Sequence, residues 1–141
     1  MPTNPAPLCA SPGSRSRTRV LVLDDDSFQL ELLAEHLRGM GFIDLTCVAS
    51  APEALRRVGG RRDSFDLILI DLHLPEMDGF QFMEGLAQVD YRGAVLIVSG
   101  QAPEVVHGAA LVAQLRRFKL LGVVAKPVER GPLAALINGS F

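Results

Sequence analysis

Asp71 stands where an apolar run of the sequence gives way to a loop that contains proline and glycine. The run before it, residues 67–70 (Leu-Ile-Leu-Ile), is typical of a strand buried on both faces, as in a parallel sheet. Open α/β sheets bind their ligands at the carboxyl ends of such strands. A carboxylate at this point is therefore a candidate nucleophile or a candidate ligand for a hard cation.

Two further apolar runs also end in charged residues. The acidic triplet at 24–26 follows the run at 20–23, and Lys126 follows the run at 122–125. Because parallel strands align their carboxyl ends along one edge of a sheet, we expect these charges to lie close to Asp71.

Carboxylates that converge in this way require a counter-charge. At a separation of ~4 Å, each pair among Asp24, Asp25 and Asp71 repels by about 4 kcal/mol at an effective dielectric constant of about 20. Mg²⁺ prefers oxygen ligands and would offset this repulsion, so that Asp71 could accept a phosphoryl group as a nucleophile. Lys126 supplies a second positive charge for phosphoryl oxygens. The pattern predicts an aspartate phosphorylation site.

The elements that must position these residues alternate between strand and helix. We expect Ser27 to cap the first helix and Ser50 to cap the second, which opens with a capping-box pattern. This alternation predicts a doubly wound α/β fold with helices on both faces of a parallel sheet. Strands are expected at about 19–24, 44–49, 66–71, 94–98 and 122–125, and five helices at about 27–39, from 50 onward, after 79, and at about 103–121 and 129–138.

Composition bounds the class of protein. The 141 residues predict one domain, 19–141, preceded by a disordered Pro-, Ser- and Arg-rich tail at 1–18. The net charge is −2 with dispersed Lys and Arg, which argues against a nucleic-acid partner. No apolar stretch approaches the ~18 residues of a membrane span. Cys9 and Cys47 lack metal-site spacing, and one pair so placed is not a disulfide framework, which indicates a reducing, cytoplasmic location.

Residues 19 to about 138 resemble the receiver domain of bacterial two-component response regulators, including the chemotaxis regulators. The resemblance implies a flavodoxin-like, five-stranded parallel sheet in the order 2-1-3-4-5 with five helices. It rests on four motifs: Asp24-Asp25, Asp71 with Leu74-Pro75-x-x-Asp78-Gly79, Ser99, and Lys126-Pro127.

The resemblance also implies a function and a site. Asp71 would accept a phosphoryl group from a histidine kinase or phosphotransfer protein, and the domain would catalyse only its own phosphorylation and dephosphorylation. Mg²⁺ (or Mn²⁺) would be bound by Asp25 and Asp71 directly, by Asp24 through water and by the backbone carbonyl of His73. The phosphoryl group would contact Ser99, Gly100 and Lys126, and the Lys126–Pro127 peptide bond would be cis.

Two features depart from the family pattern. Val123 stands where receivers carry an aromatic switch residue three positions before the lysine. The expected helix at 103–121 is long and has apolar residues on more than one face, which predicts a homodimer contact or docking of an output domain. A similar elongated helix occurs in receivers of cyclic-di-GMP phosphodiesterase-type regulators, and the chain is either a stand-alone receiver or part of a longer regulator.

Two other functions remain open. A pseudo-receiver would keep the fold and act as a phosphorylation-independent dimerisation or interaction module. A phosphatase with an aspartyl nucleophile would carry a second aspartate two residues after it, where this chain has His73. Asp26 is interpreted as a solvated neighbour of the site, and His36 and His107 as residues of helix surfaces.

Overall fold

Five parallel strands form one sheet in the order β2-β1-β3-β4-β5, which confirms the doubly wound α/β, flavodoxin-like prediction. The computed structural model describes residues 12–60, 65–72, 74, 77, 79–100, 107–108 and 119–141. The strands are β1 (Arg19–Leu23), β2 (Asp44–Val48), β3 (Leu67–Asp71), β4 (Ala94–Ser99) and β5 (Lys119–Ala125). Every residue of β3 and β4 is buried, which explains their uninterrupted apolar sequences.

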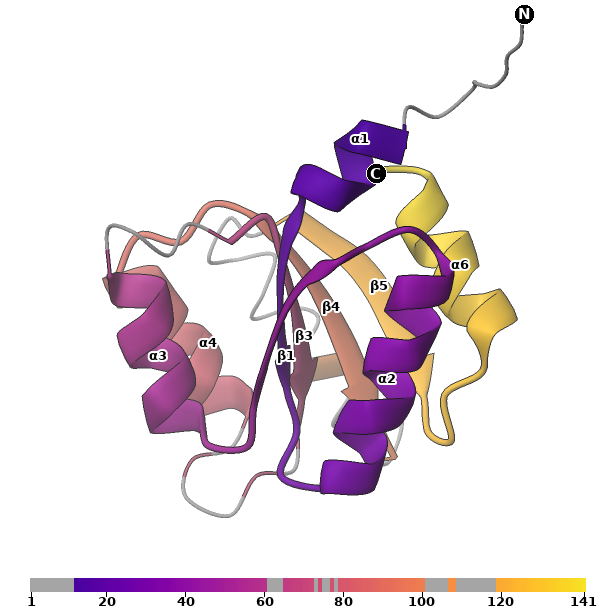
Figure 1. Cartoon of the computed structure of the whole chain (residues 1–141). Helices are drawn as coiled ribbons and strands as arrows, with labels where there is room; N and C mark the ends of the chain where they lie inside the picture. Colours follow the sequence, from indigo (N-terminus) through magenta and orange to yellow (C-terminus); the bar gives the residue numbers. More distant parts are fainter. Residues whose placement is uncertain are drawn as a thin grey trace, which may run out of the picture.

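Helices cover both faces of the sheet (Figure 1). α2 (Ser27–Gly39) and α6 (Arg130–Asn138) lie on one face, and α3 (Ala51–Gly59) and α4 (Gly79–Gln88) lie on the other. Each face has its own apolar core, in which alternate strand residues pack against the inward side of the two helices. Among the described residues, no helix is both long enough and apolar enough to cross a membrane.

The two helix caps show how local sequence sets helix starts. Ser50 caps α3 as predicted, and its Oγ accepts from the backbone N–H of Glu53 at 3.5 Å. The prediction that Ser27 caps α2 was wrong, because Oδ1 of Asp26 accepts from the backbone N–H of Phe28 at 2.9 Å and Ser27 is the first helical residue. Aspartate caps a helix as well as serine does, and its negative charge favours the helix N-terminus.

β5 begins earlier than the sequence predicts. Residues 119–121, expected to end a helix, belong to the strand, and Lys119 and Leu120 pair with β4. Leu121 is an extra residue in this pairing, because the register moves from Leu120 to Gly122 across one step of β4. Gly122 has φ 151°, a conformation that side chains rarely adopt, so glycine accommodates the bulge.

Two predictions lie partly outside the described residues. Residues 12–17 form the short helix α1 (Pro12–Arg17), so the predicted disorder of the tail is wrong for this part, while residues 1–11 are outside the description. Most of the expected helix at 103–121 is also outside it, and residues 107–108 are helical.

Arg15 explains why α1 is ordered. Its guanidinium donates to the carbonyl of Met40 at 2.7 Å, to Oδ1 of Asn138 at 2.7 Å and to the carbonyl of Phe141 at 3.1 and 3.2 Å. It also lies 5.1 Å from the centre of the Phe42 ring. α1 therefore sits beside the C-terminus, at the end of the sheet where the strands begin (Figure 1).

Candidate functional site

The charged residues singled out from the sequence meet at the carboxyl edge of the sheet. Asp71 is the last residue of β3, and Asp24 and Lys126 directly follow β1 and β5. Backbone hydrogen bonds fix the two flanking positions: Asp24 N–H donates to the carbonyl of Val48 at 3.2 Å, and Lys126 N–H donates to that of Ser99 at 3.1 Å. The parallel register thus carries three distant segments to one point.

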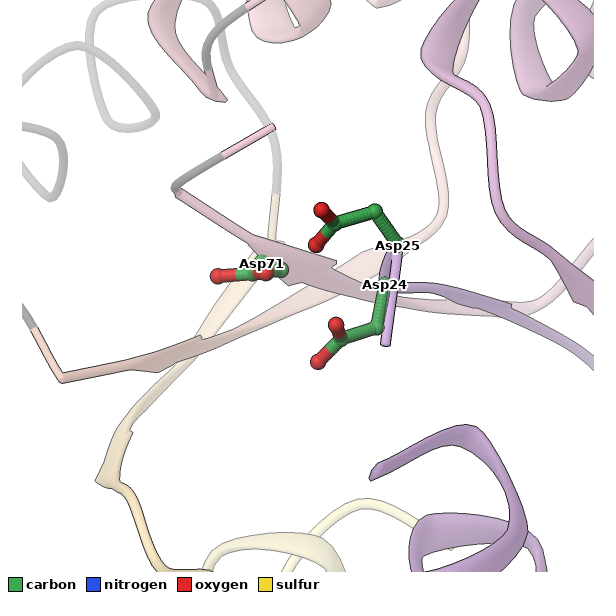
Figure 2. A group of neighbouring side chains, drawn as sticks. All are labelled: Asp24, Asp25 and Asp71. Atoms are coloured by element: carbon green, nitrogen blue, oxygen red, sulfur yellow. The ribbon is translucent and has the colours of Figure 1, made fainter. Parts of the chain in front are cut away.

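Three carboxylates form the acidic side of the site (Figure 2). One oxygen from each of Asp24, Asp25 and Asp71 lies within 4.8 Å of the others. Asp24 and Asp71 are buried, whereas Asp25 is exposed and leaves the group open to solvent. Three negative charges at this spacing repel strongly unless cations lie among them.

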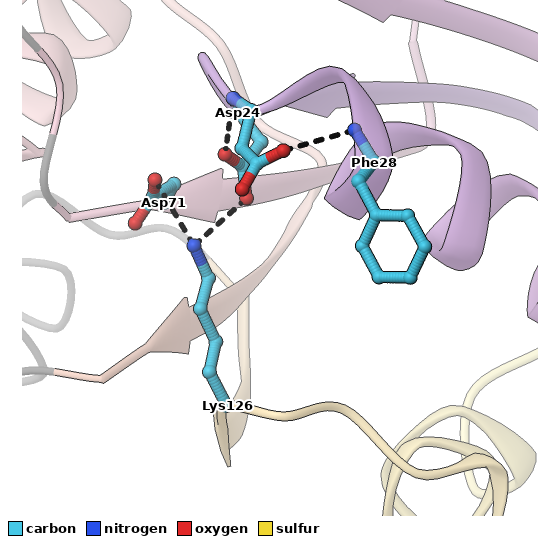
Figure 3. A network of polar contacts seen from close by, with 5 residues as sticks. Asp24, Phe28, Asp71 and Lys126 are labelled. Carbon is cyan, nitrogen blue, oxygen red and sulfur yellow. Dashed lines mark hydrogen bonds and ion pairs between the residues drawn. The ribbon is translucent and has the colours of Figure 1, made fainter.

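Lys126 is one such cation (Figure 3). Its Nζ lies 2.9 Å from Oδ2 of Asp24 and 3.2 Å from Oδ2 of Asp71. Burial lowers the pKa of Lys126, but its contacts with these carboxylates and their charges outweigh that effect and raise the pKa above its ordinary value. Three carboxylates against one ammonium still leave the group with excess negative charge.

The oxygens of Asp24 indicate how a metal ion would fit. Oδ1 accepts from the backbone N–H of Asp26 at 2.9 Å. Oδ2 is buried and, apart from its ion pair with Lys126, has no hydrogen-bond partner among the described residues. This buried oxygen can still accept an interaction, and the side-chain atoms of the group that could bind a metal ion are all carboxylate oxygens. Such a group suits a hard divalent cation such as Mg²⁺.

The remaining predicted residues lie around this group. Ser99 ends β4, is buried and pairs with Ala125 in the neighbouring strand. Gly100 is exposed, and a Cβ at its position would lie 3.9 Å from the Cβ of Lys126. Val123 is partly buried against the core on the α3–α4 face.

Two backbone features were expected at the site, and the described residues include one of them. The peptide bond between Lys126 and Pro127 is cis. The backbone carbonyl expected to bind the metal ion belongs to His73, which lies outside the described residues.

Sequence reasoning missed the contacts of one histidine. His36 was interpreted as an ordinary residue of a helix surface, but its ring is half-buried and contacts the carbonyl of Val128 and the guanidinium of Arg130. Arg130 is 94 residues away along the chain. No local pattern around His36 signals such a partner.

Comparison with known proteins identifies the family. The family model of the response regulator receiver domain matches residues 20–138, nearly all of the described chain. The chain therefore belongs to the receiver-domain family of two-component systems, as the sequence motifs predicted.

Individual relatives agree with this assignment. The two-component response regulator ARR14 of Arabidopsis thaliana is 32% identical over 123 residues, which is 82% of this chain and 32% of the relative. ARR11 of the same plant is 35% identical over 91 residues, 64% of this chain and 17% of the relative. The chain thus spans about a third or less of these curated relatives.

Solved structures show the same fold. One is a CheX–CheY–BeF3–Mg complex from Borrelia burgdorferi, with a TM-score of 0.75 and 20% identity over 86% of this chain and 87% of that one. Another is the chemotaxis protein CheY4 of Vibrio cholerae, with a TM-score of 0.71 and 22% identity over 88% of this chain and 98% of that one. At these identities the likeness concerns the fold alone.

Proposed function

We propose that Asp71 is a phosphoryl acceptor and that this receiver domain takes the group from a phosphohistidine. The observation that carries the proposal is the pairing of the buried Asp71 carboxylate with the Lys126 ammonium at 3.2 Å, beside Asp24 and Asp25. A carboxylate so placed is a nucleophile, and the ammonium offers charge stabilisation to phosphoryl oxygens.

The reaction transfers a phosphoryl group between two protein side chains. An oxygen of Asp71 bonds to phosphorus, the phosphorus–nitrogen bond of the donor breaks, and its electron pair stays on the imidazole. Lys126 and Ser99 would contact the transferred oxygens, with Gly100 leaving space beside them. Asp24, Asp25, Asp71 and the carbonyl of His73 would hold Mg²⁺, or Mn²⁺, which when bound supplies positive charge that offsets the repulsion between donor and acceptor.

The proposed partners follow from the class of protein. The donor would be a histidine kinase or a phosphotransfer protein in the cytoplasm, and the phosphorylated domain would regulate protein contacts or an output domain. The segment at 103–121 stays a predicted contact for a homodimer or an output domain. Turnover of an external substrate is not part of the proposal, since the domain would catalyse only its own phosphorylation and dephosphorylation.

A phosphorylation-independent pseudo-receiver is the alternative. What favours it is Val123, which stands at the position of the aromatic switch residue. What opposes it is the set of acidic residues and the lysine, which a module that only binds partners does not require.

Incubation with acetyl phosphate and Mg²⁺ distinguishes a phosphoryl-accepting receiver from a pseudo-receiver. We expect the wild-type chain to gain acid-labile phosphate, visible by mass spectrometry, and Asp71→Asn to gain none. Asp90→Asn is a matched control, because Asp90 is exposed and its positive φ of 60° suits asparagine. A wild-type chain that remains unmodified would overturn the proposal in favour of the pseudo-receiver, and sustained hydrolysis of a phosphomonoester would favour the phosphatase.

A further inference from the structure

A polar cluster joins the last turn of α2 to the start of α6. Nε2 of His36 lies 3.4 Å from the carbonyl oxygen of Val128. Arg130 donates from Nε to Nδ1 of His36 at 3.2 Å and from Nη2 to the carbonyl of Glu35 at 3.4 Å. Both ring nitrogens of the histidine are therefore engaged by the segment that follows Lys126.

These partners fix the tautomer of the neutral ring. Arginine has donors and no acceptor, so Nδ1 of His36 must accept and carries no proton. In the neutral ring the proton then resides on Nε2, which donates to the carbonyl of Val128. The arrangement needs the neutral imidazole, because a proton on Nδ1 would remove the acceptor and place two cations in contact.

The residues that contact His36 belong to the segment that directly follows Lys126. Val128, which is buried, follows Lys126 by two residues, and Arg130 opens α6. The guanidinium of Arg130 packs closely over Gly39, where a Cβ would come within 2.5 Å of Nη1. The backbone between Lys126 and α6 is thus attached to α2, the helix that follows the acidic triplet.

We propose that neutral His36 is a positioning residue for Lys126, which it holds toward Asp24 and Asp71 through Val128 and Arg130. The inference rests on the proposed phosphorylation of Asp71. Loss of either hydrogen bond of the ring would release the connection after β5 and reduce the fraction of molecules in which the ammonium is in place. Phosphorylation would then slow.

Three variants test the proposal, with Arg38→Gln as a control that removes an exposed arginine from the same helix. His36→Gln keeps a donor and an acceptor. His36→Leu loses both hydrogen bonds and suits a helix. Arg130→Gln removes the cation from the ring. Phosphorylation rates with acetyl phosphate and Mg²⁺ are measured at neutral pH.

At neutral pH, His36→Leu should be several-fold slower than the wild type, while His36→Gln and Arg38→Gln match it. The inference is overturned if His36→Leu phosphorylates as fast as the wild type, or if His36→Gln is as slow as His36→Leu. A wild type that takes no phosphate overturns the proposed function itself.

Nuclear magnetic resonance of the ring nitrogens gives a readout that does not depend on phosphorylation. In the wild type we expect the His36 proton on Nε2, and in Arg130→Gln, where the guanidinium no longer holds Nδ1 as an acceptor, a mixture of the two neutral tautomers. A proton on Nδ1 in the wild type would contradict the assigned hydrogen bonds and with them the inference.

Discussion

Lys126 Nζ lies 2.9 Å from Oδ2 of Asp24, although their strands β5 and β1 are separated in the sheet by β3 and β4. The long lysine side chain brings its Nζ between the two carboxylates, so that the same atom also lies 3.2 Å from Oδ2 of Asp71 (Figure 3). One ammonium therefore serves two buried carboxylates. This sharing makes the lysine important for stability as well as for chemistry.

Lys126→Met should lower the free energy of unfolding by about 2 kcal/mol in the absence of divalent cations, because it leaves buried carboxylates without their counter-charge. Millimolar Mg²⁺ should restore part of the loss by binding among the same carboxylates. Urea denaturation with a chelator and then with Mg²⁺ measures both effects.

Lys119→Met is the matched control, since Lys119 is the other lysine of the chain and is exposed at the start of β5. Lys119→Met should change the free energy of unfolding by no more than about 0.5 kcal/mol. Equal stability of Lys126→Met and wild type in chelator would show that the ammonium does not neutralise the buried pair.

Much of the fold and the charged core of the site were predictable because their signals are local. An apolar run of four residues that is followed by a charge marks both a buried strand and its ligand-binding end, as at Asp71. Parallel pairing then brings the ends together without further information. The order of the strands came from the family resemblance, since alternation alone does not specify which strand neighbours which.

The features that escaped prediction depend on partners far away in the chain. Arg15 is ordered by contacts with Met40 and the last residues of α6, and His36 is engaged by Arg130. The early start of β5 follows from pairing with β4, which overrides the helical spacing of residues 119–121. Local propensity does not report such contacts.

Asp25→Asn should weaken Mg²⁺ binding by roughly tenfold or more, about 1.4 kcal/mol, since it removes one charge from the proposed ligand group. Asp26→Asn is the comparison. Asp26 caps α2 instead of facing the other carboxylates, and asparagine caps a helix as well as aspartate. Isothermal titration calorimetry should show near-wild-type affinity for Asp26→Asn, and equal losses in both variants would mean that only overall charge matters.

Arg15→Gln should lower the free energy of unfolding by about 1.5 kcal/mol, because it removes hydrogen bonds to Met40, Asn138 and Phe141. The corresponding drop in melting temperature is about 5 °C. Arg17→Gln, at an exposed position in the same short helix, should change little. Identical melting of both variants and wild type would show that α1 adds nothing to the stability of the domain.

Tyr91, the one tyrosine of the chain, provides a test in alkali. Its hydroxyl donates to the carbonyl of Ala94 at 2.8 Å, so Tyr91→Phe should cost about 1 kcal/mol at neutral pH. Burial, assisted by the charge of Asp66, raises the pKa of Tyr91 well above its ordinary value near 10. The stability that the protonated hydroxyl contributes is therefore complete below about pH 10 and is lost as the pH rises toward the folded-state pKa.

The difference in free energy of unfolding between the wild type and Tyr91→Phe should consequently shrink above about pH 10 and reverse sign in stronger alkali. Urea denaturation at a series of pH values measures it, while tyrosinate absorbance reports ionisation directly. The raised pKa of Lys126 gives a second loss of stability over the same range, but it is present in both proteins and cancels in the comparison. A constant difference at every pH would contradict the buried hydrogen bond, because an exposed phenol would ionise alike in the folded and unfolded chains.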